Sequence, residues 1–247
     1  MPQLVPNLDR EIAQSLKMLL KKRGVTVFTG TRVSEIRPSA EGGLVCACGG
    51  DLNPDADTVL VCVGRRPCTE GLFTALSPKT ERGRIIVNEY GETDIPGVYA
   101  VGDVTGGVML AHAASAAGRN AVRRMAGLPP CADTRFIPSC IYTEPEIACV
   151  GMTADEAKAA GIAADSRKAL MTANGKTVAT GAERGYIRTV FEKETGKLLG
   201  AQMMCERASD MIGEFCMALH MGMTVTEMAR AVRPHPTFSE AITEALR

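Results

Sequence analysis

The chain has 247 residues, 28 basic and 28 acidic side chains, a formal net charge of zero and 45% hydrophobic residues. This size and composition predict one large globular domain or two small ones, and the absence of a broad basic field argues against binding to nucleic acid or an anionic membrane. The sequence contains no apolar run of 18 residues, so we expect no membrane span.

The N-terminal sequence and the cysteines indicate the cellular compartment. The first residues, 1–6, lack the basic start and the apolar core of a signal peptide. The nine cysteines therefore indicate mostly free thiols in a reducing compartment, and we expect a cytoplasmic location. Cys46 and Cys48 would share one face of a strand, which favours packing over metal binding because no second Cys or His cluster supports a metal. We predict no metal site.

The first quarter of the sequence predicts a helix followed by strands. Asp9 can cap a helix whose apolar stripe runs between residues 12 and 20 and which ends at Gly24. Apolar runs then predict strands at 25–28, 44–48 and 58–63. The last run is almost continuously apolar, a pattern typical of a buried strand in a parallel sheet.

The middle of the sequence is rich in loops between residues 65 and 93. Residues 97–103 predict a short buried strand that enters a tight turn. Residues 111–126 predict a helix closed by Gly127, and the following Leu-Pro-Pro sequence resembles a linker. We therefore place a domain boundary near residue 133.

The C-terminal part favours an α+β domain with an antiparallel sheet, because strands joined by hairpin-like turns alternate with helices there. The expected features are capping boxes at Thr153–Glu156 and Thr224–Glu227, strands at 186–191 and 198–204 around a turn at 194–197, and a helix capped by Ser209 that ends near Gly222.

Near the C-terminus, a His-Pro-Thr-Phe-Ser-Glu sequence holds His235 and Glu240. A carboxylate beside an imidazole can fix its tautomer and favour the imidazolium, so the two residues form a candidate general acid/base pair. The same sequence matches a capping box that opens a helix at 241–247. Capping is the commoner role for such a sequence, and it is compatible with an acid/base role. His112 and His220 are each more typical of structural residues than of ligands.

Two loop segments could contact a ligand. Gly102 permits close backbone approach, and the Asp103 carboxylate can accept hydrogen bonds from sugar or ribitol hydroxyls; a plain turn at the end of a strand is the alternative. Arg65 and Arg66 follow an apolar run and can bind a phosphate, although exposed arginines on a loop are more common.

Five motifs occur in order along the chain. They occupy residues 61–67, 93–103, 109–112, 142–151 and 235–240. Together they resemble the flavin-dependent pyridine nucleotide–disulfide oxidoreductases, and among these the dihydrolipoyl dehydrogenases. Residues 173–176 and 239–241 favour this group over the glutathione reductases. The resemblance covers essentially the whole chain.

The resemblance implies an α/β plus α+β fold, in which a partial nucleotide-binding three-layer region precedes an antiparallel-sheet dimerisation domain with flanking helices. Residues 1–63 resemble part of an NAD-binding domain. Residues 64–133 resemble the central region and the remainder of an FAD-binding domain. Residues 134–247 resemble the dimerisation, or interface, domain.

FAD and NAD are the cofactors that the resemblance implies. Asp103 would hold the flavin ribitol, and His235 would exchange protons with a substrate dithiol and a redox-active thiol while Glu240 orients it. The other expected cofactor-binding residues are Gly64, Gly102, Met109, Leu110, Ala111, His112 and Ala113. In such enzymes this histidine reaches across a homodimer. The further implied partner is the lipoyl-bearing subunit of a 2-oxoacid dehydrogenase or glycine cleavage complex.

Two hallmarks of the family are absent from the 247 residues, namely a G-x-G-x-x-G loop and a C-x-x-x-x-C disulfide. Cys62 and Cys68 come closest, with five residues between them. We expect the chain to correspond to the C-terminal portion of such an enzyme and to be inactive in isolation. It also departs from many relatives at Arg233, where they carry another His.

Other interpretations remain open from the sequence. One is a different flavin disulfide reductase of the mercuric or glutathione reductase type, although mercuric reductases usually end in a Cys pair that residues 245–247 do not contain. A soluble transhydrogenase is a further variant. The third is a non-enzymatic dimerisation module that associates with a full-length homologue.

Overall fold

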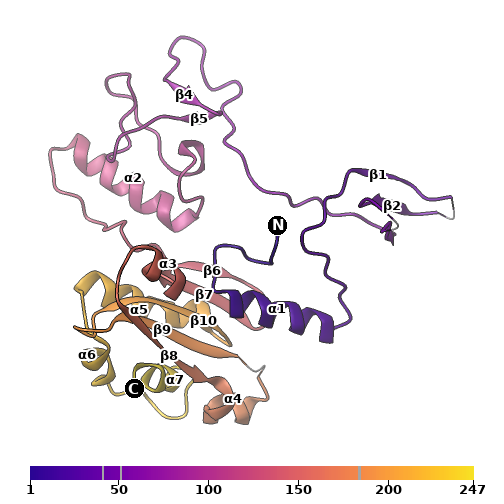
Figure 1. Cartoon of the computed structure of the whole chain (residues 1–247). Helices are drawn as coiled ribbons and strands as arrows, with labels where there is room; N and C mark the ends of the chain where they lie inside the picture. Colours follow the sequence, from indigo (N-terminus) through magenta and orange to yellow (C-terminus); the bar gives the residue numbers. More distant parts are fainter. Residues whose placement is uncertain (41, 51, 183–184) are drawn as a thin grey trace. The chain divides into compact units, whose positions relative to one another are not determined.

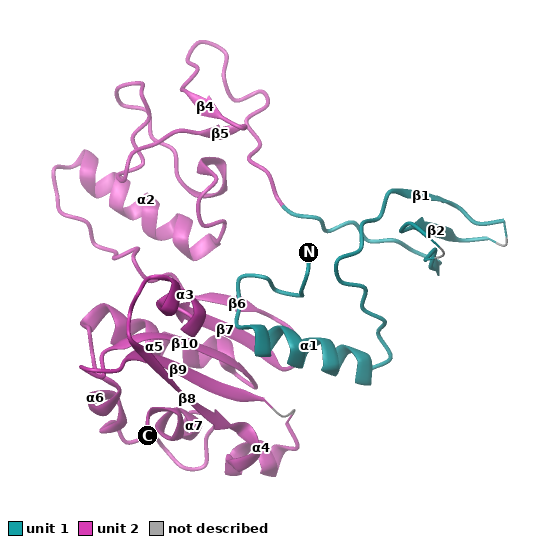
Figure 2. Ribbon diagram, viewed as in Figure 1, with its two compact units in different colours: residues 1–64 teal, residues 65–247 magenta. Residues whose placement is uncertain are grey.

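The computed structural model describes residues 1–40, 42–50, 52–182 and 185–247. These residues form two compact units, Met1–Gly64 and Arg65–Arg247, which are coloured separately in Figure 2.

The first unit consists of one helix and a small sheet. Helix α1 (Arg10–Lys22) begins where the Asp9 carboxylate accepts a hydrogen bond from the Glu11 amide at 2.7 Å, as the sequence predicted. Strands β1 (Glu35–Pro38), β2 (Leu44–Ala47) and β3 (Asp55–Ala56) pair antiparallel in that order, and the first two are labelled in Figure 1. The strand predicted at 44–48 is thereby confirmed as β2.

Two strand predictions in this unit are wrong. Residues 25–28 and 58–63 lie outside every strand that the structure describes, and Leu60 and Val63 are 85% and 94% exposed. An apolar segment becomes a buried strand only where neighbouring strands provide hydrogen bonds and side-chain contacts. Within the described part of this unit, no strand pairs with either segment, so the expected parallel sheet does not form here.

The second unit opens with a loop-rich region that carries one long helix. Strands β4 (Thr80–Glu81) and β5 (Arg84–Ile85) form a short ribbon, followed by the 3₁₀ helix η1 (Gly102–Thr105) and helix α2 (Ala111–Met125). Helix α2 confirms the prediction at 111–126. The strand expected at 97–103 is reduced to one isolated bridge between Tyr99 and Glu92, because η1 already begins at Gly102.

A five-stranded antiparallel sheet dominates the rest of this unit (Figure 1). Its strands are β6 (Ser139–Ile141), β7 (Glu146–Gly151), β8 (Ala164–Leu170), β9 (Tyr186–Glu192) and β10 (Leu198–Cys205), in the order β6-β7-β10-β9-β8. The accompanying helices are α3 (Ala154–Ala159), η2 (Met171–Ala173), α4 (Gly175–Thr180), α5 (Ala208–Met221), α6 (Val225–Ala229) and α7 (Glu240–Leu246). The predicted antiparallel sheet with flanking helices is confirmed.

The core of this sheet domain lies between the sheet and its two main helices. Helix α5 packs against β7 and β10, and α7 packs against β8 and β9. Phe215 of α5 and Ile242 of α7 are fully buried there. The buried Thr189 hydroxyl of β9 donates to the Ala245 carbonyl at 2.6 Å, which fixes α7 to the sheet. This anchoring matters because the first residue of α7 is Glu240.

Some helix starts follow the sequence signals and others differ from them. Two of the three predicted capping boxes form, at Thr153–Glu156 and at Thr224–Glu227. Ser209 does not cap α5, whose N-cap is Arg207. Instead, the Ser209 amide and hydroxyl both donate to the Glu146 carboxylate, at 2.8 and 2.6 Å. The Glu146 carboxylate of β7 thus accepts a hydrogen bond from a backbone amide in the first turn of α5. The two residues are 63 positions apart in the sequence.

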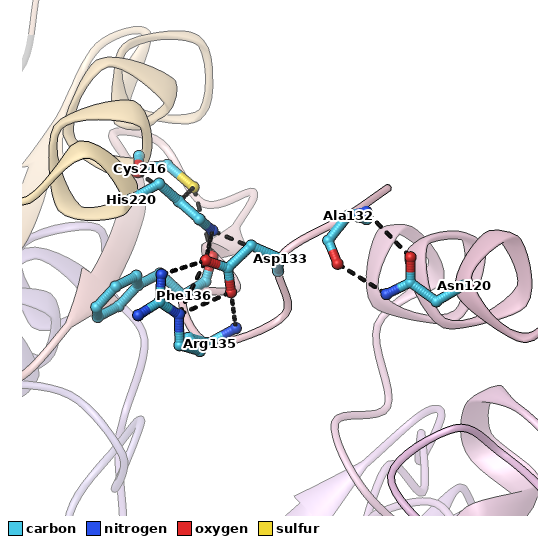
Figure 3. Close-up of polar contacts among 7 residues, drawn as sticks. All are labelled: Asn120, Ala132, Asp133, Arg135, Phe136, Cys216 and His220. Atoms are coloured by element: carbon cyan, nitrogen blue, oxygen red, sulfur yellow. Dashed lines mark hydrogen bonds and ion pairs between the residues drawn. The ribbon is translucent and has the colours of Figure 1, made fainter. Parts of the chain in front are cut away.

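Hydrogen bonds hold the segment between α2 and β6 at both of its ends (Figure 3). Asn120 of α2 accepts hydrogen bonds from the amides of Cys131 and Ala132, both at 3.0 Å. At the other end, the two ring nitrogens of His220 lie 2.7 Å from the Cys216 carbonyl and 3.1 Å from the Asp133 carbonyl. His220 therefore occupies a structural position, as its sequence context suggested.

Asp133 makes the stability of this segment dependent on pH. The side-chain and backbone donors of Arg135 lower the pKa of the Asp133 carboxyl to about 2. A lowered pKa stabilises the fold above the ordinary aspartate range, and this stabilisation is lost as the pH falls from about 4 to about 2. Asp133→Asn should therefore lower the melting temperature at pH 5, and the difference from wild type should shrink steadily as the pH falls through about 2. Asp57→Asn, at an exposed aspartate, is the control; equal acid dependence in the Asp133→Asn protein and wild type would contradict this assignment.

In the described part of the chain, no helix is long and apolar enough to cross a membrane.

Candidate functional site

His235 and Glu240 form a hydrogen-bonded pair at the start of α7. His235 Nδ1 lies 2.9 Å from Glu240 Oε1, and the His235 side chain is 78% exposed while that of Glu240 is 31% exposed. Because a carboxylate only accepts hydrogen bonds, the proton of the neutral ring resides on Nδ1. The Nε2 edge of the imidazole is then left as a proton acceptor, so the pair can take up and release a proton.

The same carboxylate also contacts the backbone, so the capping interpretation is half correct. Thr237 N donates to Glu240 Oε2 at 2.9 Å, but the Thr237 hydroxyl donates to the Pro234 carbonyl at 2.7 Å instead of capping the helix. Helix α7 begins at Glu240, one residue earlier than predicted, and its N-cap Ser239 makes no side-chain capping bond. The Thr237 amide, and after it the His235 ring, lower the pKa of Glu240. Glu240 is thereby held in its charged form.

An open hollow of about 660 Å³ adjoins the pair, bordered by the end of β8 and the start of α4. Asn174 lines it and is only 6% exposed. The Asn174 Oδ1 atom accepts from the Thr177 amide at 2.9 Å, while Nδ2 donates to the Thr237 carbonyl at 2.9 Å. Asn174 thus caps α4 and holds the loop that carries His235. Its N-cap position could be recognised from the sequence, but its contact with Thr237 could not.

The predicted flavin-binding segments come together around η1 and the start of α2, which pack against each other. Gly102 has φ 79°, and a Cβ there would lie 3.1 Å from the Ala114 Cβ. Helix α2 starts after Leu110, which provides no side-chain capping bond among the described residues. The predicted residues Met109, Leu110, Ala111, His112 and Ala113 line this helix start; Ala113 is buried, and His112 Nε2 lies 2.7 Å from the Pro138 carbonyl.

Asp103 follows Gly102 and pairs with Arg65. Arg65 Nε lies 3.1 Å from Asp103 Oδ2, and the two side chains are 75% and 39% exposed. Arg65 therefore contacts a carboxylate rather than standing alone on the loop surface. Gly64, the remaining predicted cofactor residue, is the last residue of the first unit and has φ 128°.

The residues at this helix start fit a flavin. The Asp103 carboxylate can accept hydrogen bonds from the hydroxyls of a ribitol chain, and its second oxygen is not engaged by Arg65. Backbone N–H groups in the first turn of α2 carry partial positive charge and suit the carbonyl oxygens of an isoalloxazine ring. For metals the result differs: among the described residues, no three His, Cys, Asp or Glu side chains cluster as metal ligands.

Comparison with known families decides the affiliation of the chain. Residues 1–118 match the model described as pyridine nucleotide-disulphide oxidoreductase, and residues 137–246 match the dimerisation domain of the same enzymes. The chain belongs to the pyridine nucleotide-disulphide oxidoreductases. The resemblance found in the sequence motifs is thereby confirmed.

Curated relatives of this pyridine nucleotide-disulphide oxidoreductase include several dihydrolipoyl dehydrogenases. The enzyme from Thermus scotoductus is 40% identical over 251 residues, which cover 99% of this chain and 54% of the relative. The enzyme from Rhizobium etli is 36% identical over 255 residues, covering 100% of this chain and 52% of the relative. The chain thus spans about half the length of the curated relatives it matches.

Solved structures agree with the fold. The crystal structure of LpdA from Mycobacterium tuberculosis is 26% identical with a TM-score of 0.86, covering 96% of this chain and 52% of that one. The HOCl-induced flavoprotein disulfide reductase RclA from Escherichia coli is 22% identical with a TM-score of 0.89, covering 98% of this chain and 56% of that one. At that identity, the second likeness concerns the fold alone.

Proposed function

We propose that this chain provides the acid/base pair and part of the flavin-binding surface of a dihydrolipoyl dehydrogenase, which oxidises protein-bound dihydrolipoamide to lipoamide. The observation that carries the proposal is the hydrogen bond between His235 Nδ1 and Glu240 Oε1, which leaves the Nε2 edge of an exposed imidazole available to a dithiol. The dihydrolipoyl dehydrogenase relatives support the choice of substrate.

Each side chain has a defined task in this proposal. His235 accepts a proton at Nε2 as the substrate thiol becomes a thiolate, and returns it when a thiol must leave. Glu240 keeps the proton of the neutral ring on Nδ1 and stabilises the imidazolium. Asp103 and the first amides of α2 would hold FAD, which when bound would supply the two-electron acceptor between the dithiol and NAD.

The proposal includes partners and a location. We assign a homodimer, on the strength of the matched dimerisation domain, and a lipoyl-bearing subunit of a 2-oxoacid dehydrogenase or glycine cleavage complex as the source of substrate. All nine cysteines are free thiols, which is compatible with the cytoplasm as the proposed location.

The purified 247-residue chain should show no dihydrolipoamide:NAD oxidoreductase activity by itself. These residues contain neither a C-x-x-x-x-C disulfide to oxidise the substrate dithiol nor a G-x-G-x-x-G loop to hold a dinucleotide pyrophosphate. The measurement is NADH formation with dihydrolipoamide, with the Thermus scotoductus relative as positive control. Sustained turnover by the isolated chain would contradict this division of labour.

Reconstitution tests whether the chain completes a dihydrolipoyl dehydrogenase when the remaining portion of such an enzyme is supplied. The portion of the Thermus scotoductus enzyme that this chain does not span should be expressed together with the chain, either fused upstream or as a separate polypeptide. We expect a complex that retains FAD and reduces NAD with dihydrolipoamide. A flavin-loaded complex that oxidises NADPH but never dihydrolipoamide would instead favour another disulfide reductase.

A further inference from the structure

Arg233 stands two residues before His235 and is nearly inaccessible to solvent. Its side chain is 5% exposed, whereas that of its ion-pair partner Glu214 is 38% exposed. A guanidinium remains charged at all relevant pH values, and a charge is retained in such a place only where its donors are satisfied. The environment of Arg233 is therefore built around this side chain.

The donors of Arg233 connect three parts of the chain. Nε and Nη2 donate to the two carboxylate oxygens of Glu214 on α5, the first at 3.4 Å. Nη1 donates to the Thr243 hydroxyl of α7 at 2.8 Å and to the Ala231 carbonyl at 3.2 Å. A planar guanidinium can serve these acceptors at once, but a lysine ammonium cannot reproduce this fork.

The loop that Arg233 anchors is the loop that supplies both partners of Glu240. His235 Nδ1 and the Thr237 amide bind the two oxygens of the Glu240 carboxylate. Glu240 and Thr243 both belong to α7, so the loop is attached to this helix at two places. Arg233 provides one attachment from inside the protein, and only Pro234 separates it from His235.

We propose that Arg233 is a positioning residue for His235: its contacts with Glu214 and Thr243 hold the 231–237 loop against α5 and α7, so that the imidazole stays within hydrogen-bond distance of Glu240. The functional importance of this positioning rests on the proposed acid/base role of His235 and Glu240. The physical claim, however, concerns the geometry of His235 and can be tested without flavin or substrate.

Thermal stability alone cannot test this inference. Removing one partner of a poorly accessible ion pair is destabilising in any case, because the other charge loses its compensation. A purely structural Arg233 would therefore also lower the melting temperature when replaced. The informative readout is the tautomer of His235, because the hydrogen bond to Glu240 selects the Nδ1–H form.

The experiment is ¹⁵N NMR of the imidazole rings in the full 247-residue chain at a pH where His235 is neutral. The chain has three histidines, so His112 and His220 serve as internal references. Wild type should show His235 mainly as the Nδ1–H tautomer, and Glu240→Ala should shift it toward Nε2–H. Arg233→Gln should shift it in the same direction, and Arg233→Lys should not restore the wild-type spectrum. Arg230→Gln, an exposed arginine nearby, is the matched control and should change nothing.

Two further variants keep the test decisive. Thr243→Val removes only the attachment to α7 with little change of shape, so it should produce a smaller shift in the same direction even if Arg233→Gln does not fold. In a Glu240→Ala background, Arg233→Gln should cause no additional shift. Folded Arg233→Gln or Thr243→Val protein with a wild-type tautomer of His235 would overturn the proposal.

Discussion

Replacing His235 by Gln should lower the dihydrolipoamide-oxidising turnover of the reconstituted, flavin-loaded protein by roughly 10²–10⁴-fold, the usual contribution of a general acid/base. Glutamine has a similar reach and can accept a hydrogen bond, but it cannot take up the thiol proton. The side chain is 78% exposed, so its replacement should hardly alter the fold. The flavin content and melting temperature of the variant should stay close to those of wild type.

Glu240 should show a smaller effect of the same kind. Glu240→Gln can still accept a hydrogen bond from His235 Nδ1 but no longer stabilises the imidazolium, so turnover should fall less than in His235→Gln. Glu194→Gln, in the exposed turn before β10, is the matched control and should leave turnover unchanged. A His235→Gln protein with wild-type turnover would remove the pair from the mechanism.

Gly200→Ala should destabilise the sheet domain by about 3 kcal/mol, at the upper end of the cost of overpacking. Gly200 of β10 lies opposite Gly151 of β7. A Cβ at this position would lie 2.5 Å from Met152 N and even closer to the Met152 carbonyl oxygen. Because both atoms belong to the backbone, no side-chain rotation relieves the overlap and the strands must separate.

Gly213→Ala is the matched control for this substitution. Gly213 is an exposed residue inside α5, and a Cβ there meets no atom within 4 Å. Alanine in a helix is favoured over glycine, so this variant should gain about 0.5–1 kcal/mol. Urea unfolding of both proteins measures the difference in the free energy of unfolding. Equal midpoints for the two variants would contradict the packing described for β7 and β10.

Local signals predicted much of the structure. The Asp9 cap, the two capping boxes, helix α2 and strands β9 and β10 depend on residues within a few positions of one another, so sequence spacing describes them well. His235 and Glu240 belong to the same class, because a loop and one helical turn are enough to bring them together.

The failures concern contacts that are distant in sequence. The apolar run at 58–63 forms a strand only beside neighbouring strands, and its local sequence does not show whether such strands are present. Ser209 looks like a helix cap, but its partner Glu146 is 63 residues away. Arg233 appeared only as a departure from relatives, because its partner Glu214 lies 19 residues earlier, on helix α5.

The central claim is that His235 acts as an acid/base toward a thiol. The most direct test is how the ratio of kcat/KM between wild type and His235→Gln changes with pH. The measurement is kcat/KM for dihydrolipoamide in the reconstituted wild type and His235→Gln proteins, from neutral to alkaline pH. A thiol that ionises unaided at high pH no longer needs a base. We therefore predict that the ratio of wild type to variant is largest near neutral pH and falls as the pH rises. A ratio that stays constant across this range would contradict an acid/base role for His235.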